Sequence, residues 1–383
     1  MELSKYYKIK ERKKDDELYS DNFSKSYSEW KLSNGQEYLE IYAPDYYTLG
    51  YLQGRELENE IEMMKSLLKL LTIKYILKRF SYSKLREMAR RYERYIPKHC
   101  QIEMKGMADA VDDVDYDDIL LQNCFMDIMY GDLIPNNYVD GDFQDFDLGC
   151  TSLGIKRKNN PLIGQNFDYP FFFRSAASFV HLISPNNSEI FSLRLGGMLS
   201  LPVGINSSGL SLRINVIKSN LPANPSMPAT IKSRIGLEFS RNSVDFYSFL
   251  INQKNSASCN LMIADKSYLY ALECLPKFFV KKEIKNYVVN SNTYTSLEFQ
   301  TYLINKDYSK ERQDYTENRL KEMYEIKGDY INDDDMLEIL KDFPIICRNN
   351  PFKPMTLAFL TNKYFGLGGP DDHEPGLVPL NIS

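Results

Sequence analysis

The chain has 383 residues, of which 43% are hydrophobic and 26% charged, and its formal net charge is −5. This apolar fraction is sufficient for a packed core and excludes wholesale disorder. The mildly acidic balance argues against phosphate binding as the main task, so we expect no nucleic-acid partner. No stretch of the sequence approaches eighteen consecutive apolar residues, so we expect no membrane-spanning helix and no membrane partner.

The cysteine and histidine content limits the chemistry that the chain can perform. Six cysteines are scattered without a CxxC pair, and the N-terminus lacks the apolar segment of a secretory signal. Neither a disulfide framework nor a zinc site is indicated, and we expect reduced thiols and a cytoplasmic protein. The three histidines argue against a His-rich metal centre, and we expect no metal.

The first part of the chain is predicted to be largely helical. Residues 1–35 are charged and tyrosine-rich, and we interpret them as an N-terminal arm. Apolar residues recur at helical spacing between Tyr47 and about Arg79. Further helices are predicted over 81–95, with Ser81 as N-cap, and over 100–111 and 117–130. The segment 131–149 is acidic and turn-rich.

The hydrophobic period then changes to two. Strands are predicted over 151–156, 162–168, 179–184, 189–195, 204–214, 259–264, 268–274, 278–282, 287–290, 355–360 and 364–367. Helices are predicted over 229–253, with a break at 242–243, and over 309–324 and 334–340. This order predicts an α+β fold in which sheets pack face to face with helices outside them.

Cys150 stands where the acidic loop meets the first of these strands. Taken alone it could be a buried structural cysteine, because free cysteine is usually a small core residue. A hairpin turn centred on Asn159-Asn160 would place Cys150 opposite Tyr169 and beside Asp168. A thiol after a glycine can attack the preceding carbonyl in an N-to-S acyl shift, and hydrolysis of the thioester would leave Cys150 as a new N-terminus. Its free α-amine, with a pKa of roughly 7.7–8.0, could then serve as the base without any histidine.

Around this junction the chain resembles the acyl-coenzyme A:6-aminopenicillanate (isopenicillin N) acyltransferase family, which belongs to the N-terminal-nucleophile hydrolases. The resemblance covers roughly residues 40–375 and is carried by an ordered set of short segments. They are Gly-Tyr-Leu-Gln-Gly at 50–54, the stretch 123–131 ending in Tyr-Gly, Gly-Cys-Thr at 149–151, Gly-Gln-Asn-Phe-Asp at 164–168, Gly-Ile-Asn-Ser-Ser-Gly at 204–209, Asn-Ser-Asn-Thr at 290–293, Ile-Cys-Arg at 346–348 and Leu-Gly-Gly-Pro at 367–370.

The resemblance implies a four-layer αββα sandwich with a helical pro-region. The implied divisions are an arm at 1–35, a helical α-chain at 36–149 and a catalytic β-chain at 150–383. Cleavage would fall between Gly149 and Cys150, with Cys150 as nucleophile. Asp168 would lie near the new amine or a polar group of the substrate, and the amide of Asn292 would point into the oxyanion hole.

The resemblance also implies substrate contacts. Arg348 would meet a substrate carboxylate, which a guanidinium binds in a two-pronged way. Phe167 and Tyr169 could line an apolar acyl pocket near Cys150, although such an aromatic run could equally be plain core. Thr293-Tyr294 stand where the penicillin enzymes have His-Cys, so the mechanism is carried over more safely than the substrate.

We therefore predict a self-cleaving N-terminal-cysteine amidohydrolase or acyltransferase that forms an acyl-enzyme on Cys150. The expected substrate is a small acyl amide or acyl thioester, and the cleaved α and β chains are expected to stay associated. No cofactor is expected, with acyl-CoA as a potential co-substrate. Two alternatives stay open: a non-catalytic family member that binds a small amphiphile or a partner, and a strictly hydrolytic amidase of the bile-salt or penicillin V type.

Overall fold

Two β-sheets form the centre of the molecule. The computed structural model describes residues 22–76, 80–139, 149–157, 160–304, 307–348 and 355–381. Residues 1–21 of the predicted arm and 140–148 of the acidic loop lie outside these ranges. The larger sheet contains, in spatial order, β1 (Tyr27–Ser33), β2 (Gln36–Tyr42), β5 (Ala177–Ile183), β6 (Glu189–Leu195), β7 (Gly204–Asn206), β8 (Ser211–Val216), β9 (Cys259–Ala264), β10 (Leu269–Cys274) and β11 (Phe279–Glu283). The smaller sheet contains β12 (Tyr287–Asn290), β3 (Cys150–Ile155), β4 (Leu162–Tyr169), β13 (Met355–Leu360), β14 (Tyr364–Leu367) and β15 (Gly376–Leu377).

The sheets pack face to face, and β8 of the larger sheet contacts β3 and β4 of the smaller one. Polar side chains join the two layers: Ser152 donates to Asn215 (2.6 Å) and Arg213 donates to the carbonyl of Thr361 (3.2 Å). Each of these groups is buried and would be costly without its partner.

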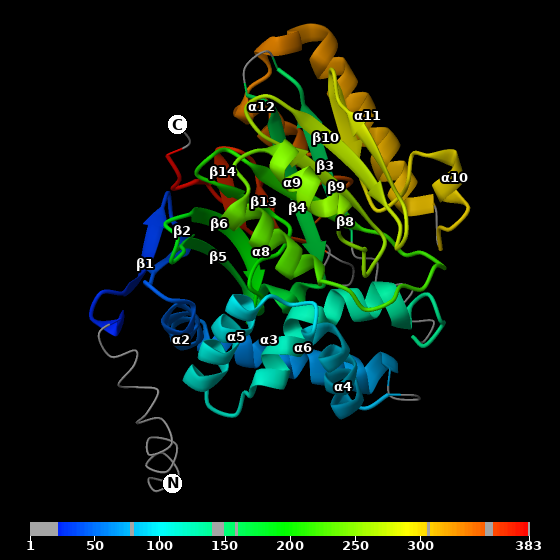
Figure 1. Cartoon of the computed structure of the whole chain (residues 1–383). Helices are drawn as coiled ribbons and strands as arrows, with labels where there is room; N and C mark the ends of the chain where they lie inside the picture. The colour runs from blue at the N-terminus through cyan, green and yellow to red at the C-terminus, as the bar shows by residue number, and fades with distance from the viewer. Residues whose placement is uncertain are drawn as a thin grey trace, which may run out of the picture.

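Helices cover both outer faces (Figure 1), which confirms the predicted α+β fold and its αββα layers. On the outer side of the larger sheet lie α2 (Tyr46–Glu56), α3 (Glu58–Leu71), α4 (Tyr82–Glu93), α5 (Lys98–Ala110), α6 (Tyr116–Ile128), α8 (Ala229–Phe239) and α9 (Ser243–Ile251). On the smaller sheet lie α11 (Asp307–Lys327) and α12 (Asp333–Leu340), and the short α10 (Leu297–Gln300) precedes them. None of the helices in the described ranges has the length and apolar character needed to cross a membrane.

The strands β1 and β2 were not predicted, and they add a hairpin to a segment that was expected to be largely helical. They form a hairpin, and β2 pairs in parallel with β5. Because Glu40 is charged and partly buried within β2, the sequence of this strand lacks the alternation of apolar and polar residues that predicts a strand. Its carboxylate is satisfied by Lys31 (2.6 Å) and by His181 on β5 (3.1 Å), so a charge can sit within this strand.

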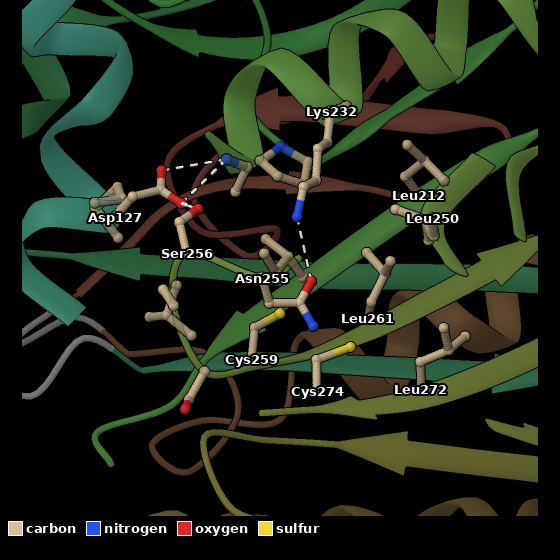
Figure 2. A pocket seen from close by; sticks show the side chains of 18 of the residues that line it. Asp127, Leu212, Lys232, Leu250, Asn255, Ser256, Cys259, Leu261, Leu272 and Cys274 are labelled. Atoms are coloured by element: carbon tan, nitrogen blue, oxygen red, sulfur yellow. Dashed lines mark hydrogen bonds between the residues drawn. The ribbon is translucent and has the colours of Figure 1, made fainter. Parts of the chain in front are cut away.

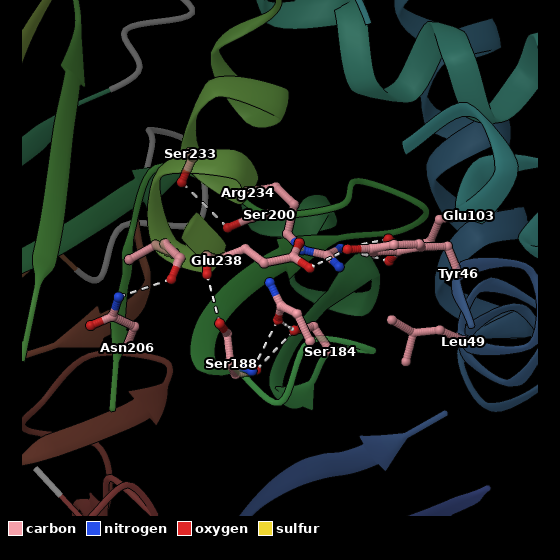
Figure 3. Close-up of polar contacts among 12 residues, drawn as sticks. Tyr46, Leu49, Glu103, Ser184, Ser188, Ser200, Asn206, Ser233, Arg234 and Glu238 are labelled. Atoms are coloured by element: carbon pink, nitrogen blue, oxygen red, sulfur yellow. Dashed lines mark hydrogen bonds and ion pairs between the residues drawn. The ribbon is translucent and has the colours of Figure 1, made fainter. Parts of the chain in front are cut away.

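A buried ionic network ties α5 to α8 (Figure 3). Arg234 on α8 donates to both carboxylate oxygens of Glu103 on α5, each at 2.7 Å, and pairs with Glu238 at 3.0 Å. The hydroxyl of Tyr46 donates to Glu238 at 2.7 Å. Because Glu103 precedes and Arg234 follows residue 149, this network and the β2–β5 pairing connect the two parts of the chain on either side of the predicted cleavage point.

The strand predicted over 204–214 is two strands, β7 and β8, separated by a tight turn. The side chain of Asn206 organises this turn by accepting from the backbone N–H groups of Ser208 and Leu210. Its amide donates to the carbonyls of Leu237 and Ser240 at the end of α8. Gly209 adopts a φ of 87°, which favours glycine. This Gly-Ile-Asn-Ser-Ser-Gly segment therefore anchors α8 on the sheet.

Candidate active site

The junction between Gly149 and Cys150 lies at the start of β3, and Cys150 pairs with Phe167 on β4. The predicted partner, Tyr169, is wrong by two residues. Asn159 of the predicted turn lies outside the described residues, and the register of β3 on β4 is shifted by two residues at every pair. Continued by one step, the observed register places Asp168 opposite Gly149. The acid therefore faces the peptide bond before Cys150 more directly than the sequence analysis implied.

Gly149 is surrounded by charged side chains. A Cβ atom at this position would lie 2.2 Å from Nη1 of Arg348, 3.2 Å from Oδ2 of Asp168 and 3.3 Å from Nη2 of Arg312. Because this nitrogen is the far end of a flexible side chain, an alanine at position 149 would displace the guanidinium of Arg348. Two of the predicted site residues, Asp168 and Arg348, are thus brought together at the junction.

The backbone of Cys150 is fixed by hydrogen bonds on both sides. Its N–H donates to Oδ1 of Asn292 at 2.8 Å. Its carbonyl accepts from Nη1 of Arg312 at 2.9 Å and from Nδ2 of Asn215 at 2.8 Å. The residue predicted to be the nucleophile is therefore held in one orientation by three side chains from different elements.

The thiol of Cys150 is buried, with 2% of the residue exposed. Burial raises its pKa to about 12, and the negative charge of Asp168 acts in the same direction. Opposing contributions come from the Asp168 backbone N–H, the charge of Arg312 and the side chain of Gln165. In the intact chain the thiol is therefore protonated at neutral pH, and a nucleophilic attack needs a group that accepts its proton.

Asp168 is a buried acid beside the junction. Its Oδ1 accepts from the hydroxyl of Thr356 at 2.9 Å, and its Oδ2 lies 3.5 Å from Nη1 of Arg348. Complete burial raises the pKa of Asp168 above its ordinary value, although Arg348 and Arg312 favour the charged form. A buried carboxylate with a raised pKa has increased affinity for a proton.

Asn292 lies at the site but is oriented differently from the expectation. Its Nδ2 donates to the carbonyl of Val216 at 2.7 Å. Its Oδ1 faces the junction, where it accepts from the Cys150 N–H and from Nη2 of Arg312, the latter at 2.9 Å. In the intact chain Asn292 therefore holds the nitrogen of the junction, and one of the two N–H groups of its amide is engaged by Val216. Its oxyanion role stays a prediction.

Arg312 on α11 was missed by the sequence analysis. Besides Cys150 and Asn292 it contacts the hydroxyl of Thr151 at 2.9 Å, and the side chain is completely buried. The helical spacing of the residues around Arg312 could have indicated that this side chain is buried. Ser309, Thr316 and Leu320 are buried on the same helix, so an arginine at position 312 faces inward even though the helix as a whole is strongly charged.

Phe167 and Tyr169 lie near Cys150, and both are buried. Their rings stack at a centroid distance of 4.8 Å, and the Tyr169 hydroxyl lies 2.7 Å from Sδ of Met126. A cavity of about 60 Å³ lies under α8 and α9, but neither aromatic residue lines it. Met126 and Val216 do line it and also contact Tyr169 and Asn292. The role of Phe167 and Tyr169 in substrate binding stays a prediction.

Comparisons with known proteins agree with this arrangement at the level of the family. The model of the acyl-coenzyme A:6-aminopenicillanic acid acyl-transferase family matches residues 155–353. This range contains Asp168, Asn292 and Arg348 and begins shortly after Cys150.

Two individual proteins are also similar to the chain. An uncharacterized protein of Archaeoglobus fulgidus is 25% identical over 201 residues, which are 49% of this chain and 34% of that protein. The chain thus spans about a third of the length of this relative. A solved structure, the Caenorhabditis elegans N-acylethanolamine-hydrolyzing acid amidase (NAAA) ortholog, is 15% identical with a TM-score of 0.44, and the match covers 60% of this chain and 100% of that one.

Proposed function

Because the chain belongs to the acyl-coenzyme A:6-aminopenicillanic acid acyltransferase family, we propose that it is an N-terminal-nucleophile hydrolase or acyltransferase whose nucleophile is Cys150, released by self-cleavage after Gly149. The observation that carries the proposal is the convergence of an acid, two arginines and an asparagine on one Gly–Cys peptide. A structural cysteine would need none of these charged neighbours, which are costly to bury.

Self-cleavage begins with attack of the Cys150 sulfur on the carbonyl carbon of Gly149. Asp168 accepts the thiol proton and passes it to the nitrogen of Cys150 as the C–N bond breaks and the S–C bond forms. Arg348, which touches Gly149, stabilises the negative charge that develops on the Gly149 carbonyl oxygen. Water then hydrolyses the thioester, which leaves a carboxylate on Gly149 and a free thiol and α-amine on Cys150.

In the cleaved enzyme the α-amine of Cys150 takes over as base, because its pKa of roughly 7.7–8.0 suits neutral pH. It accepts the thiol proton during attack on an acyl carbonyl and returns it to the leaving group. We assign the oxyanion role to Asn292, whose Nδ2 carries a second N–H besides the one that donates to the Val216 carbonyl. One such donor typically contributes about 2.7–4 kcal/mol to the transition state.

Departure of the Gly149 end uncovers Arg348, which we propose binds a carboxylate of the substrate. The acyl donor is a small amide or thioester, for which acyl-CoA is a candidate, and no cofactor takes part. The acyl-enzyme is resolved by water or by an amine acceptor. The two chains remain associated, because the β2–β5 pairing and the Glu103–Arg234 ion pair both span the cleavage point.

The test is turnover of a panel of N-acyl amino acids, acyl-CoAs and β-lactams by the wild type, Cys150→Ser and Cys100→Ala. Cys100 is a buried cysteine of α5 and serves as the matched control. We expect the wild type and Cys100→Ala to turn over at least one class and Cys150→Ser to be severely impaired. Equal turnover by Cys150→Ser, or none by any protein, would remove the catalytic assignment. Adding an amine acceptor distinguishes transfer from hydrolysis.

A further inference from the structure

The cavity under α8 and α9 is lined mainly by apolar side chains (Figure 2). Its walls include Leu212, Leu250, Leu261 and Leu272, and it is about 60 Å³ in volume. Since one water needs about 10–15 Å³ by this kind of measure, the space holds about four to six non-hydrogen atoms. Cys150, Asp168 and Asn292 are not among the residues that line it, so it is separate from the proposed nucleophile.

One side chain in this cavity ends in a titratable amine, whose pKa is lowered by burial. Lys232 on α8 is only 7% exposed, and Figure 2 shows its amine pointing across the space toward Asn255. Two of its N–H groups are used, on the carbonyl of Lys254 (2.5 Å) and on Oδ1 of Asn255 (3.2 Å). An ammonium has three donors, and the third has no acceptor within the part of the chain that the structure describes.

Lys232 also lacks a paired anion. In the described ranges it forms no ion pair, and Asp127 influences it only as a more distant charge. The carboxylate of Asp127 is itself engaged by the backbone N–H of Ala229 and the hydroxyl of Ser256. A buried cation is costly unless an anion compensates it. An anionic group in the adjoining space would supply that compensation and accept the third N–H.

A cationic groove lies beside the cavity. The segment 252–254 lines the groove, and its continuation, 255–259, lines the cavity. The groove has a volume of about 800 Å³, and its charged lining residues are Arg90, Arg91, Arg94 and Lys254. Of these, Arg94 and Lys254 form no ion pair with a carboxylate in the described ranges. Such a surface attracts anions and raises their local concentration.

We propose that the cavity binds a small apolar monocarboxylate, whose carboxylate accepts the third N–H of Lys232 and whose tail lies between Leu250, Leu261 and Leu272. The cationic groove attracts the ligand before it enters. This site goes beyond the proposed function and does not depend on it, because no residue of the cleavage junction takes part.

The test measures binding of butanoate, which has six non-hydrogen atoms, to the full chain by isothermal titration calorimetry, with butanamide as a neutral ligand of the same shape. We expect butanoate to bind and butanamide to bind at least about 10-fold more weakly, since a hydrogen bond between charged groups is being replaced. Lys232→Met should weaken butanoate binding by a similar factor. The matched control is Lys277→Met, which removes an exposed lysine and should bind like the wild type.

A second variant guards against an effect of Lys232→Met on folding. Leu250→Trp keeps the amine and fills the space from α9, so it should abolish butanoate binding. The proposal is overturned if butanoate does not bind, if butanamide binds equally well, or if either cavity variant binds butanoate as the wild type does. None of these results depends on whether Cys150 is catalytic, so failure here is distinguishable from failure of the proposed function.

Discussion

Arg312 offers a way to disturb the junction without changing Cys150, Asp168 or Gly149. Its guanidinium donates to the Cys150 carbonyl, the Thr151 hydroxyl and Oδ1 of Asn292, each at 2.9 Å. Arg312→Met keeps most of the apolar stem and removes all three bonds. The nitrogen and the carbonyl of Cys150 would then be positioned by Asn292 and Asn215 alone.

The expected effect of Arg312→Met on the rate of self-cleavage follows from these contacts. A hydrogen bond to a charged group contributes about 1.5–3 kcal/mol. The loss is smaller than three such terms, because the Cys150 carbonyl keeps its bond from Asn215 and Asn292 keeps its bond from the Cys150 N–H. We expect the barrier to self-cleavage to rise by about 3 kcal/mol, which slows cleavage about 100-fold.

The assay follows the fraction of cleaved chain with time by denaturing electrophoresis after synthesis of the protein in vitro. Arg319→Met is the matched control on the same helix. Arg319 is 38% exposed and pairs with Asp342 at 2.8 Å, so its loss should cost no more than about 1 kcal/mol and leave cleavage unchanged. Equal cleavage rates for Arg312→Met and Arg319→Met would refute the reasoning.

Three further predictions test other parts of the account. Gly149→Ala should slow cleavage, seen as a larger share of intact chain on denaturing electrophoresis, because the new Cβ displaces the guanidinium of Arg348 from the junction. Glu103→Gln should lower the free energy of unfolding in urea by about 1.5–3 kcal/mol, because it weakens the charge-assisted hydrogen bonds of Arg234, which keeps Glu238 as an anionic partner. Burial raises the pKa of Asp127 to about 6 from an ordinary 3.8, so the folded state holds this proton more tightly than the unfolded state. The associated stability, about 3 kcal/mol, is present below about pH 4 and is lost as the pH rises through 6, and Asp127→Asn should flatten this dependence.

Two of these predictions have a matched control, and all three have a contradicting result. Gly154→Ala, in β3, displaces the side chain of Met262 in place of Arg348 and should still be cleaved. Cleavage of Gly149→Ala at the wild-type rate would contradict the packing argument. The control for Glu103→Gln is Glu87→Gln, in an exposed pair with Lys84, which should change the free energy of unfolding by less than about 1 kcal/mol. If Glu103→Gln lowered the free energy of unfolding no more than Glu87→Gln does, the buried pair would not be stabilising. A pH profile of Asp127→Asn identical to that of the wild type would contradict the raised pKa.

Segments with a clear hydrophobic period were well predicted from the sequence. The helix expected over 117–130 is α6, and the strands expected over 259–264 and 287–290 are β9 and β12. Ser81 caps α4 as predicted, since its hydroxyl accepts from the N–H of Lys84. In these segments local pattern and tertiary burial agree, and the sequence is therefore sufficient.

The remaining features depend on contacts between distant parts of the chain. β2 carries Glu40, whose charge is tolerated only because Lys31 and a histidine on β5 meet it. Arg312 joins the site through α11, more than 150 residues after the junction. The orientation of Asn292 is set by Val216 and Cys150 on two different sheets. None of these partners can be read from local periodicity.

The intact masses of the denatured wild type and of Cys150→Ala test the central claim most directly. The account predicts that the wild type separates into two fragments, 1–149 and 150–383, the second beginning with an unblocked cysteine, while Cys150→Ala stays as one chain. A wild-type chain that remains whole, or cleavage at the same bond in Cys150→Ala, would contradict it.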